Sequence, residues 1–492
     1  MNNDRYKKAH LSPRSCPHPT ARVIKMKLET KFRLTLYDYK YFTMKKASHI
    51  LIITLLLFIG SSPLFAQKKE LSLQEALSMA KQGNKTLQVQ VLEEKHAIEQ
   101  TRESRGRLLP DISAGVAYSR YFDRQNIFLP GSFAGTNKAV QEVAVGGRNA
   151  FNGFVSLYQP VLDIASYRLT KASKINEKIQ TEKTEDLKSQ VALWVSTRYL
   201  DILMMKRQLI LLQQSHERNV RALKDSRALL AQGKGLKSDT LRSFIAVENL
   251  KSSVSYLKNS IEVSGMELKR LIGMEDAQEL ELTDELESDI QANQTEFLTV
   301  SKALEIAETN RNDLNVQELT LELQQQKLSA AKAALLPKLS LIGQYQIQAQ
   351  ADDLKLNDYV WPRTSFLGLQ VSIPILNGGQ NKSRIGQARI LAQQEQIRLK
   401  DLKEEVKTTL ASIISKWKEA TSQLEIQITT VQSAELNHQM TEDRFKNGLG
   451  SRLELTDAEL ALTQAKINYL QAIYNLRRLH TELQYALGLL EL

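Results

Sequence analysis

Histidine is sparse after residue 66, and the side chains capable of metal binding or acid–base chemistry form no recognisable site there. The histidines of this part are His96, His216, His438 and His480. They form no HExxH motif, and no two of them have ligand spacing on one helix face. The segment Gly233-Lys234-Gly235 lacks the further glycine and the Ser/Thr of a phosphate-binding loop. We therefore expect no catalytic residue, no cofactor and no metal, and we do not expect an enzyme.

The basic character of the chain comes from its N-terminal segment. The 492 residues include 66 Lys and Arg and 55 Asp and Glu, a formal net charge of +11. Residues 1–66 hold 12 of the basic and 3 of the acidic residues, which leaves 54 basic and 52 acidic residues and a net charge of about +2. So small a charge provides no electrostatic basis for binding DNA or RNA.

The segment 44–66 has the three regions of a secretory signal peptide. Met44-Lys45-Lys46 supplies positive charge, residues 50–60 form an apolar run, and small residues lead to Ala66, after which we expect cleavage. The apolar run is shorter than a membrane-spanning helix needs. A signal anchor that stays attached is the alternative interpretation. The sequence thus predicts an exported protein.

Residues 1–43 precede this signal, and we interpret them as an upstream extension of the reading frame, with Met44 as the initiator. The single cysteine, Cys16, lies in this extension. The exported protein is therefore expected to have no disulfide, no cysteine metal site and no lipid anchor on cysteine.

Two very long helices are predicted. Residues 164–231 contain neither Pro nor Gly and repeat apolar residues at helical spacing, and residues 381–445 contain a single glycine. At 1.5 Å per residue the first helix would extend roughly 100 Å. Leu453, Leu460 and Ile467 recur every seven residues, as in a coiled coil. Shorter helices are expected at about 72–106, 238–272, 300–333 and 453–487.

Four segments alternate apolar with polar or small residues, as Leu339, Leu341 and Tyr345 do. This pattern suits a membrane β-barrel and also a half-buried soluble sheet. Export, and the polar, irregular loops 120–150 and 350–363 within the strand pairs, favour the barrel. Four strands are too few to close a barrel, so the chain must oligomerise. The strands are expected at about 111–123, 151–163, 338–349 and 364–376.

The two halves of the chain repeat one another. Residues 71–90 match residues 298–317 with seven identities at a constant offset of 227, and Gly233 matches Gly448 at an offset of 215. This period is too long for a solenoid, so each copy is half of one fold. The repeats are residues 67–290 and 291–492.

Together these features resemble the TolC-like family of outer-membrane efflux proteins, in order, over residues 70–490. No single motif decides the resemblance, but their order and duplication are specific. The motifs are Leu71–Leu77, Arg107-Leu-Leu-Pro110, Gln370–Gly379 and Arg444–Asp457 with the Ala-rich helix that follows.

The resemblance implies an α+β membrane protein that forms a homotrimer in the outer membrane of a Gram-negative bacterium. Four strands per chain would form a 12-stranded transmembrane β-barrel in contact with outer-membrane lipid, and the helices would form a coiled-coil barrel in the periplasm. The implied function is the exit duct of a tripartite efflux or type I secretion system. Such a duct passively conducts substrates from an inner-membrane transporter and a periplasmic adaptor, or membrane fusion protein, to the exterior. A periplasmic coiled-coil adaptor or scaffold protein is the alternative.

The resemblance places two turns between helices at the periplasmic tip, and implies that they dock the adaptor. Gly233 and Gly448 are expected to end their helices in the left-handed conformation. Ser238 or Asp239 is expected to cap the helix that follows the first turn. The candidate docking residues are Gly233, Lys234, Gly235 and Leu236 in the first turn and Gly448, Leu449, Gly450 and Ser451 in the second.

In the family, acidic side chains just after the second turn point into the periplasmic entrance, and by motif alignment these are Glu454 and Asp457. Rings of like charge from several chains would attract cations. Arg444 and Arg452 are candidates for inter-helix ion pairs that hold the entrance shut, and solvated surface pairs are the alternative. This sequence has Glu454 where an Asp is familiar.

Overall fold

A computed structural model describes residues 69–133, 135, 137–275, 280–286 and 298–492. The chain divides into two units, residues 1–67 and residues 68–492. All elements named below belong to the second unit. The predicted upstream extension 1–43, with Cys16, and the predicted signal peptide 44–66 lie outside the described residues.

One antiparallel sheet of four strands joins the two repeats, because β5 of the first repeat pairs with β7 of the second. The strand order is β2-β5-β7-β8, so in the described part of the chain β2 and β8 each have one unpaired edge. The expected combination of long helices with strands is confirmed. The strands are β2 (Asp111–Arg120), β5 (Asn149–Leu162), β7 (Lys338–Ala351) and β8 (Arg363–Ser372), within a few residues of the ranges expected from sequence.

The two faces of this sheet differ in polarity. On one face, the Oγ atoms of Ser113 and Ser156 lie 2.7 Å apart, and Gln346 Nε2 donates a hydrogen bond to Asn152 Oδ1 at 2.9 Å. Directly opposed residues of neighbouring strands share a face, so the register assigns alternate residues to the second face. That second face exposes the apolar side chains of Ile112, Val116, Leu367, Leu369 and Val371.

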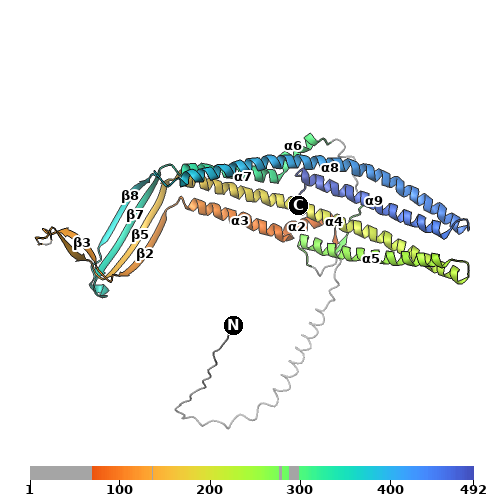
Figure 1. Ribbon diagram of the computed structural model, residues 1–492, viewed down its shortest axis with the longest axis horizontal. Coiled ribbons are helices and arrows are strands. Elements are labelled where there is room, and N and C mark those ends of the chain that lie inside the picture. Colours follow the sequence, from red (N-terminus) through yellow and green to blue (C-terminus); the bar gives the residue numbers. More distant parts are fainter. Residues whose placement is uncertain (1–68, 134, 136, 276–279, 287–297) are drawn as a thin grey trace, which may run out of the picture. The chain divides into compact units, whose positions relative to one another are not determined.

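Two long helices continue from the sheet (Figure 1). α4 (Ile164–Ala231) has 68 residues and α8 (Gln380–Lys446) has 67, so each is about 100 Å long. Asp163 lies between β5 and α4, and its Oδ1 accepts a hydrogen bond from the Ser166 N–H at 3.1 Å. Its other carboxylate oxygen lies 3.0 Å from Lys338 Nζ at the start of β7. This carboxylate therefore links the first turn of α4 to the neighbouring strand.

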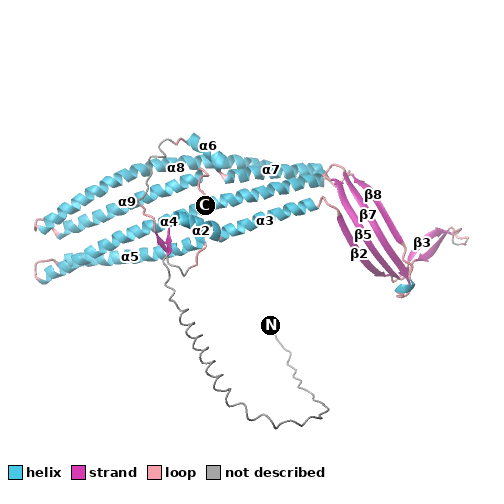
Figure 2. Ribbon diagram, turned by 180° about the vertical axis from the view of Figure 1, so that it is seen from behind, coloured by secondary structure: helices cyan, strands magenta, loops and turns pink. Residues whose placement is uncertain are grey.

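Shorter helices lie along the two long ones in end-to-end pairs (Figure 2). α3 and α5 pack on α4, and α7 and α9 pack on both α4 and α8. The order of the helices is therefore α3 and α5, α4, α7 and α9, α8, which follows the strand order β2-β5-β7-β8. The shorter helices are α2 (Leu73–Gly83), α3 (Lys85–Gly106), α5 (Lys237–Ile272), α6 (Val300–Asn310), α7 (Asn312–Ala333) and α9 (Arg452–Ala486).

The junction between end-to-end helices is built the same way in both repeats. In the first repeat, Asn84 Nδ2 donates to the Leu271 carbonyl at 2.8 Å. In the second, Arg311 Nη1 donates to the Ala486 carbonyl at 3.0 Å. The donors are 227 residues apart and the acceptors 215, which are the offsets of the duplication. An amide in one repeat and a guanidinium in the other therefore donate hydrogen bonds to equivalent carbonyls, which have no partner within their own helix because they lie at its C-terminus.

The junction at Arg311 contains further charges. The Arg311 guanidinium forms a bidentate pair with Asp313, at 2.9 and 2.6 Å. Asp186 on α4 lies nearby; its burial, and then the charge of Asp313, raise the pKa of the Asp186 carboxyl above its ordinary value. Gln190 Nε2 donates to Asp186 Oδ2 at 2.7 Å. The second repeat thus joins α4, α7 and α9 through a half-buried polar cluster.

The main apolar core lies around the middle of α4. Val191, Val195 and Tyr199 are buried there against residues of α2, α5 and α9. The Tyr199 hydroxyl lies 2.9 Å from the Leu71 carbonyl oxygen and 2.8 Å from Asp284 Oδ2. Leu71 belongs to a short parallel pair that the sequence did not predict, β1 (Lys69–Leu71) with β6 (Leu280–Leu282).

Two expectations of the sequence are wrong. The helices expected at 72–106 and 300–333 are each interrupted by one residue, Asn84 or Arg311, with ψ of 117° and 118°. These extended residues turn the chain so that their side chains reach the neighbouring helix end. The segment 120–150, expected to be irregular, contains a hairpin whose alternating apolar residues pair across two strands. Its strands are β3 (Gln125–Pro130) and β4 (Val140–Val145).

Gly273 and Gly265 provide a matched test of the first junction. Gly273 has φ of +73°, and a Cβ there would collide with the carbonyl oxygen of Gly83. Gly265 is helical and has open space around it. We expect Gly273→Ala to lower the free energy of unfolding by at least about 1–2 kcal/mol, the cost of a left-handed non-glycine residue. Gly265→Ala should raise it by up to about 1 kcal/mol.

Thermal unfolding of the purified full chain, followed by circular dichroism, measures both effects. Shifts of the midpoint in opposite directions support the junction as described. A Gly273→Ala protein as stable as the Gly265→Ala protein would show that this close approach does not exist.

Candidate functional site

The turn between α4 and α5 lies at the end of the helices remote from the sheet (Figure 1). Gly233 has φ of +71°, and its N–H donates to the Leu230 carbonyl at 3.0 Å. The Lys234 N–H donates to the Leu229 carbonyl at 2.9 Å. This pair of bonds is a Schellman motif, which satisfies the last carbonyls of α4.

The turn between α8 and α9 repeats this geometry. Gly448 also has φ of +71°, and its N–H donates to the Phe445 carbonyl at 3.0 Å. The Leu449 N–H donates to the Arg444 carbonyl at 2.8 Å. A Cβ at Gly450 would come within 3.2 Å of the Phe445 backbone nitrogen, and Gly235 is similarly close to the end of α4. The first glycine of each turn therefore adopts the left-handed conformation that favours glycine, and the second lies close against the end of the preceding helix.

The two turns differ in how the next helix begins. Ser451 Oγ accepts a hydrogen bond from the Glu454 N–H at 3.2 Å, which caps α9. α5 begins one residue earlier than expected, so its N-cap is Leu236, which has no side-chain cap. The prediction that Ser238 or Asp239 caps α5 is therefore wrong, because both lie inside its first turn. The spacing Ser451-x-x-Glu454 is a capping signature that the sequence analysis missed.

Both turns present large apolar side chains to solvent. Leu236 is 67% exposed and Leu449 is 73% exposed. Lys234 and Ser451 are also exposed, whereas Gly235 and Gly450 are half-buried against the helix ends. A leucine on a rigid, solvent-exposed turn contributes nothing to the core, so these two side chains are available for contact with another surface.

The four candidate residues of the periplasmic entrance, or gate residues, make different contacts. They are Arg444, Arg452, Glu454 and Asp457. Arg444 Nη2 lies 3.9 Å from a Glu454 carboxylate oxygen, and both side chains are more than half exposed. Such a surface pair contributes little to stability. Arg452 instead lies over the ring of Phe445, 5.4 Å from its centroid. Asp457 is exposed on the next turn of α9. The structure therefore brings Arg444 and Glu454 together, and sequence analysis missed the contact of Arg452 with Phe445.

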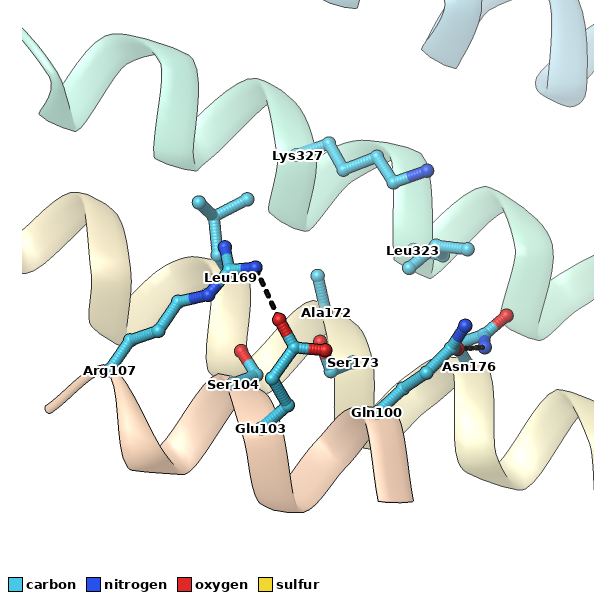
Figure 3. A pocket seen from close by; sticks show the side chains of 10 residues that line it. All are labelled: Gln100, Glu103, Ser104, Arg107, Leu169, Ala172, Ser173, Asn176, Leu323 and Lys327. Carbon is cyan, nitrogen blue, oxygen red and sulfur yellow. Dashed lines mark hydrogen bonds and ion pairs between the residues drawn. The ribbon is translucent and has the colours of Figure 1, made fainter. Parts of the chain in front are cut away.

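Metal-binding clusters and hollows are the remaining features of the described residues that bear on ligand binding. Within the described residues, no three His, Cys, Asp or Glu side chains are placed to hold a metal ion. A hollow of about 430 Å³ lies between α3, α4 and α7 (Figure 3). Its charged lining includes an ion pair, Arg107 Nη2 to Glu103 at 2.8 Å, in which both side chains are largely exposed. Figure 3 shows a wide groove between packed helices, with side chains from all three.

Comparison with known proteins identifies what this arrangement is. The family model described as outer membrane efflux protein matches residues 76–274 and 303–489, most of each repeat. The chain belongs to this family. It is therefore an outer-membrane channel that acts as an exit duct, with its long helices in the periplasm. The family consists of transport channels, and its match favours the duct over the alternative of a periplasmic adaptor.

Individual relatives are distant in sequence and close in fold. Proteases secretion protein PrtF of Dickeya chrysanthemi is 21% identical over 334 residues, 66% of this chain and 71% of PrtF. The CmeC outer-membrane channel of Campylobacter jejuni is 18% identical, with a TM-score of 0.70 over 85% of this chain and 86% of CmeC. The outer-membrane protein VceC of Vibrio cholerae is 14% identical, with a TM-score of 0.69 over 85% of this chain and 96% of VceC.

Membrane-spanning helices play no part in this assignment. In the regions that the structure describes, no helix combines the length and the apolar character needed to cross a bilayer.

The cap of α9 can be tested against an uncapped position. Ser451→Ala removes the acceptor for the Glu454 N–H, and loss of such a cap typically costs about 1 kcal/mol. We expect faster amide hydrogen exchange in the first turn of α9. Ser238→Ala in the first turn of α5 removes a serine that caps nothing, so exchange there should not change. Equal effects of the two substitutions on their own helix ends would contradict the assignment of Ser451 as the cap.

Proposed function

We propose that this channel works as a homotrimer in which twelve strands form one transmembrane barrel and the helices form one periplasmic tunnel. The observation that carries the proposal is the pair of unpaired sheet edges, β2 and β8. Backbone groups at an open edge have no partner in lipid, and four strands cannot close a barrel. Pairing β8 of one chain with β2 of the next would satisfy both edges.

The helices at the same two sides support this assembly. On α8, Ile390, Ile397 and Met440 are exposed and lie on the opposite side of the helix from the buried Leu410 and Trp417. A second apolar stripe on a helix that already has a buried face indicates a further partner. The other edge of the chain also exposes apolar side chains, at Val89 and Leu92 on α3 and at Ile245, Tyr256 and Val263 on α5.

The proposed trimer would act with a periplasmic adaptor and an inner-membrane transporter, and would conduct their substrates passively to the exterior. We propose that the adaptor docks on the two tip turns, residues 233–236 and 448–451, where Leu236 and Leu449 are exposed. The relative PrtF is described as a secretion protein for proteases. Type I secretion is therefore one of the two systems proposed, and tripartite efflux is the other.

We further propose that Glu454 and Asp457 line the periplasmic entrance of this tunnel. Both carboxylates are exposed near the start of α9. Carboxylates from several chains around a narrow opening would favour cations over anions. Arg444, 3.9 Å from Glu454, and Arg452, over the ring of Phe445, would add two weak contacts between α8 and α9 beside this entrance.

A charge introduced into the second apolar stripe of α8, which includes Ile390, Ile397 and Met440, tests trimer formation. Ile397 is 69% exposed in one chain and would be covered in the trimer. Ile397→Glu should therefore reduce the fraction of heat-sensitive trimer on semi-native gels of outer-membrane fractions. Gln396→Glu adds the same charge one residue away, outside the stripe, and should leave the trimer intact. If the Ile397→Glu protein assembles as well as the control, this stripe is not an assembly interface.

The entrance assignment is tested by ion selectivity in planar bilayers. The double variant Glu454→Gln and Asp457→Asn should lower the cation-to-anion permeability ratio of the reconstituted channel. The difference should shrink at 1 M salt, where the screening length is only about 3 Å. Glu442→Gln is the control, since its carboxylate has a pKa lowered by a hydrogen bond from Lys446 and lies on α8 before the turn. A larger effect of the control would exclude this entrance.

A further inference from the structure

The end of the sheet remote from the helices is closed by a small polar cap. Asn149 is buried there, and its Nδ2 donates to the carbonyls of Asp352 and Asp353 at 3.1 and 2.9 Å. The Tyr118 hydroxyl donates to Asn149 Oδ1 at 2.9 Å. The segment after β7, which includes η1 (Leu356–Asp358), is thus fixed on the ends of β2 and β5.

Aromatic rings gather at the margin of the apolar face beside this cap. Tyr118 and Phe151 are directly opposed across β2 and β5, with ring centroids 4.9 Å apart. Tyr359 and Trp361 pack on the Phe151 ring at 5.9 and 6.2 Å. Aromatic rings at the margin of an apolar band are typical of the interface between a membrane and water.

Two arginines stand at the same margin on the same face. Arg120 is the last residue of β2, two positions after Tyr118, and Arg363 is the first residue of β8, opposite Ile347. Both side chains are exposed, and neither has an ion-pair partner in the part of the chain that the structure describes. The carboxylate of Asp352 is already engaged by the Arg124 guanidinium and the Arg148 N–H.

These arginines occupy the two unpaired edges of the sheet. In the proposed trimer, β8 of one chain would adjoin β2 of the next at the usual strand spacing of about 5 Å. We call each such junction between two chains a seam. Each seam would bring Arg363 of one chain and Arg120 of the next to the outer margin of the barrel. Unpaired charges are unfavourable on a lipid-facing surface except near the interface, where they can meet charged headgroups.

We propose that each seam binds the phosphate of an outer-leaflet glycolipid between Arg120 and Arg363, with its acyl chains on the apolar face below. Guanidinium groups bind phosphate oxygens through paired, charge-assisted hydrogen bonds. The exposed side chains of Val116, Leu367 and Leu369 offer the apolar surface for the chains. This inference rests on the proposed trimer, because one chain supplies only half of each seam.

Native mass spectrometry of the full-chain trimer in detergent, titrated with diphosphorylated lipid A, tests the site. At roughly fivefold for each arginine near a charged membrane surface, Arg120→Gln and Arg363→Gln should each weaken lipid A binding about fivefold, and the double variant about thirtyfold. Arg384→Gln, an exposed arginine at the helical end of the sheet, should bind like the wild type. Inorganic phosphate at the same concentration should not displace the lipid.

Each contrary result overturns the inference. Undiminished lipid A binding by the double variant, or an equal loss in Arg384→Gln, would show that these two arginines are not the site. Displacement by equimolar inorganic phosphate would show a simple anion site with no lipid preference. A semi-native gel run beforehand tests the proposed function separately. If no trimer is present on the gel, the proposed assembly fails. If the trimer is present but the lipid results are contrary, only the lipid site fails.

Discussion

Unpaired strand edges are the constraint on which the rest of this molecule depends. A strand in hydrocarbon must find hydrogen-bond partners for all its backbone groups within protein, because lipid offers none. One chain leaves an edge of β2 and an edge of β8 without partners in the described structure. The helices follow the same side-to-side order as the strands, so any closure of the sheet also brings the outermost helices of neighbouring chains together. In the proposed trimer, one arrangement of the chains would therefore serve both the sheet and the helices.

The duplication has preserved an interaction and changed the residues that make it. Asn84 and Arg311 stand at equivalent positions, and each donates to the last carbonyls of the helix that ends beside it. The glycines after those helices, Gly273 and Gly488, both have positive φ and both approach the neighbouring backbone closely. The unchanging requirement is that carbonyls at a helix end find donors, which an amide meets in the first repeat and a guanidinium in the second.

Sequence patterns predicted the long elements well because those patterns are periodic and long. Absence of Pro and Gly over 164–231 fixes α4, and strict alternation fixes β7. Single-residue breaks at Asn84 and Arg311 were missed. Asn84 is a local N-cap of α3, since its Oδ1 accepts a hydrogen bond from the Leu87 N–H. Arg311 makes no such cap, and its break accompanies a tertiary hydrogen bond to the Ala486 carbonyl. At the tips, the sequence predicted the positions of the helix-ending glycines, because only glycine adopts that backbone conformation easily. It did not predict the contact of Arg452 with Phe445, because an exposed side chain has several possible contacts of similar, small energy.

The uninterrupted helices have a consequence for how such proteins change in length during evolution. One inserted residue in α4 would rotate every later side chain of that helix by about 100° and misplace its buried face. Only insertions of whole heptads keep the packing, and each adds about 10 Å of helix. The partner helix α5 must gain the same number, and so must α8 and α9, if both turns are to stay level. The distance that the tips span across a periplasm of given depth is therefore adjustable only in coarse, matched steps.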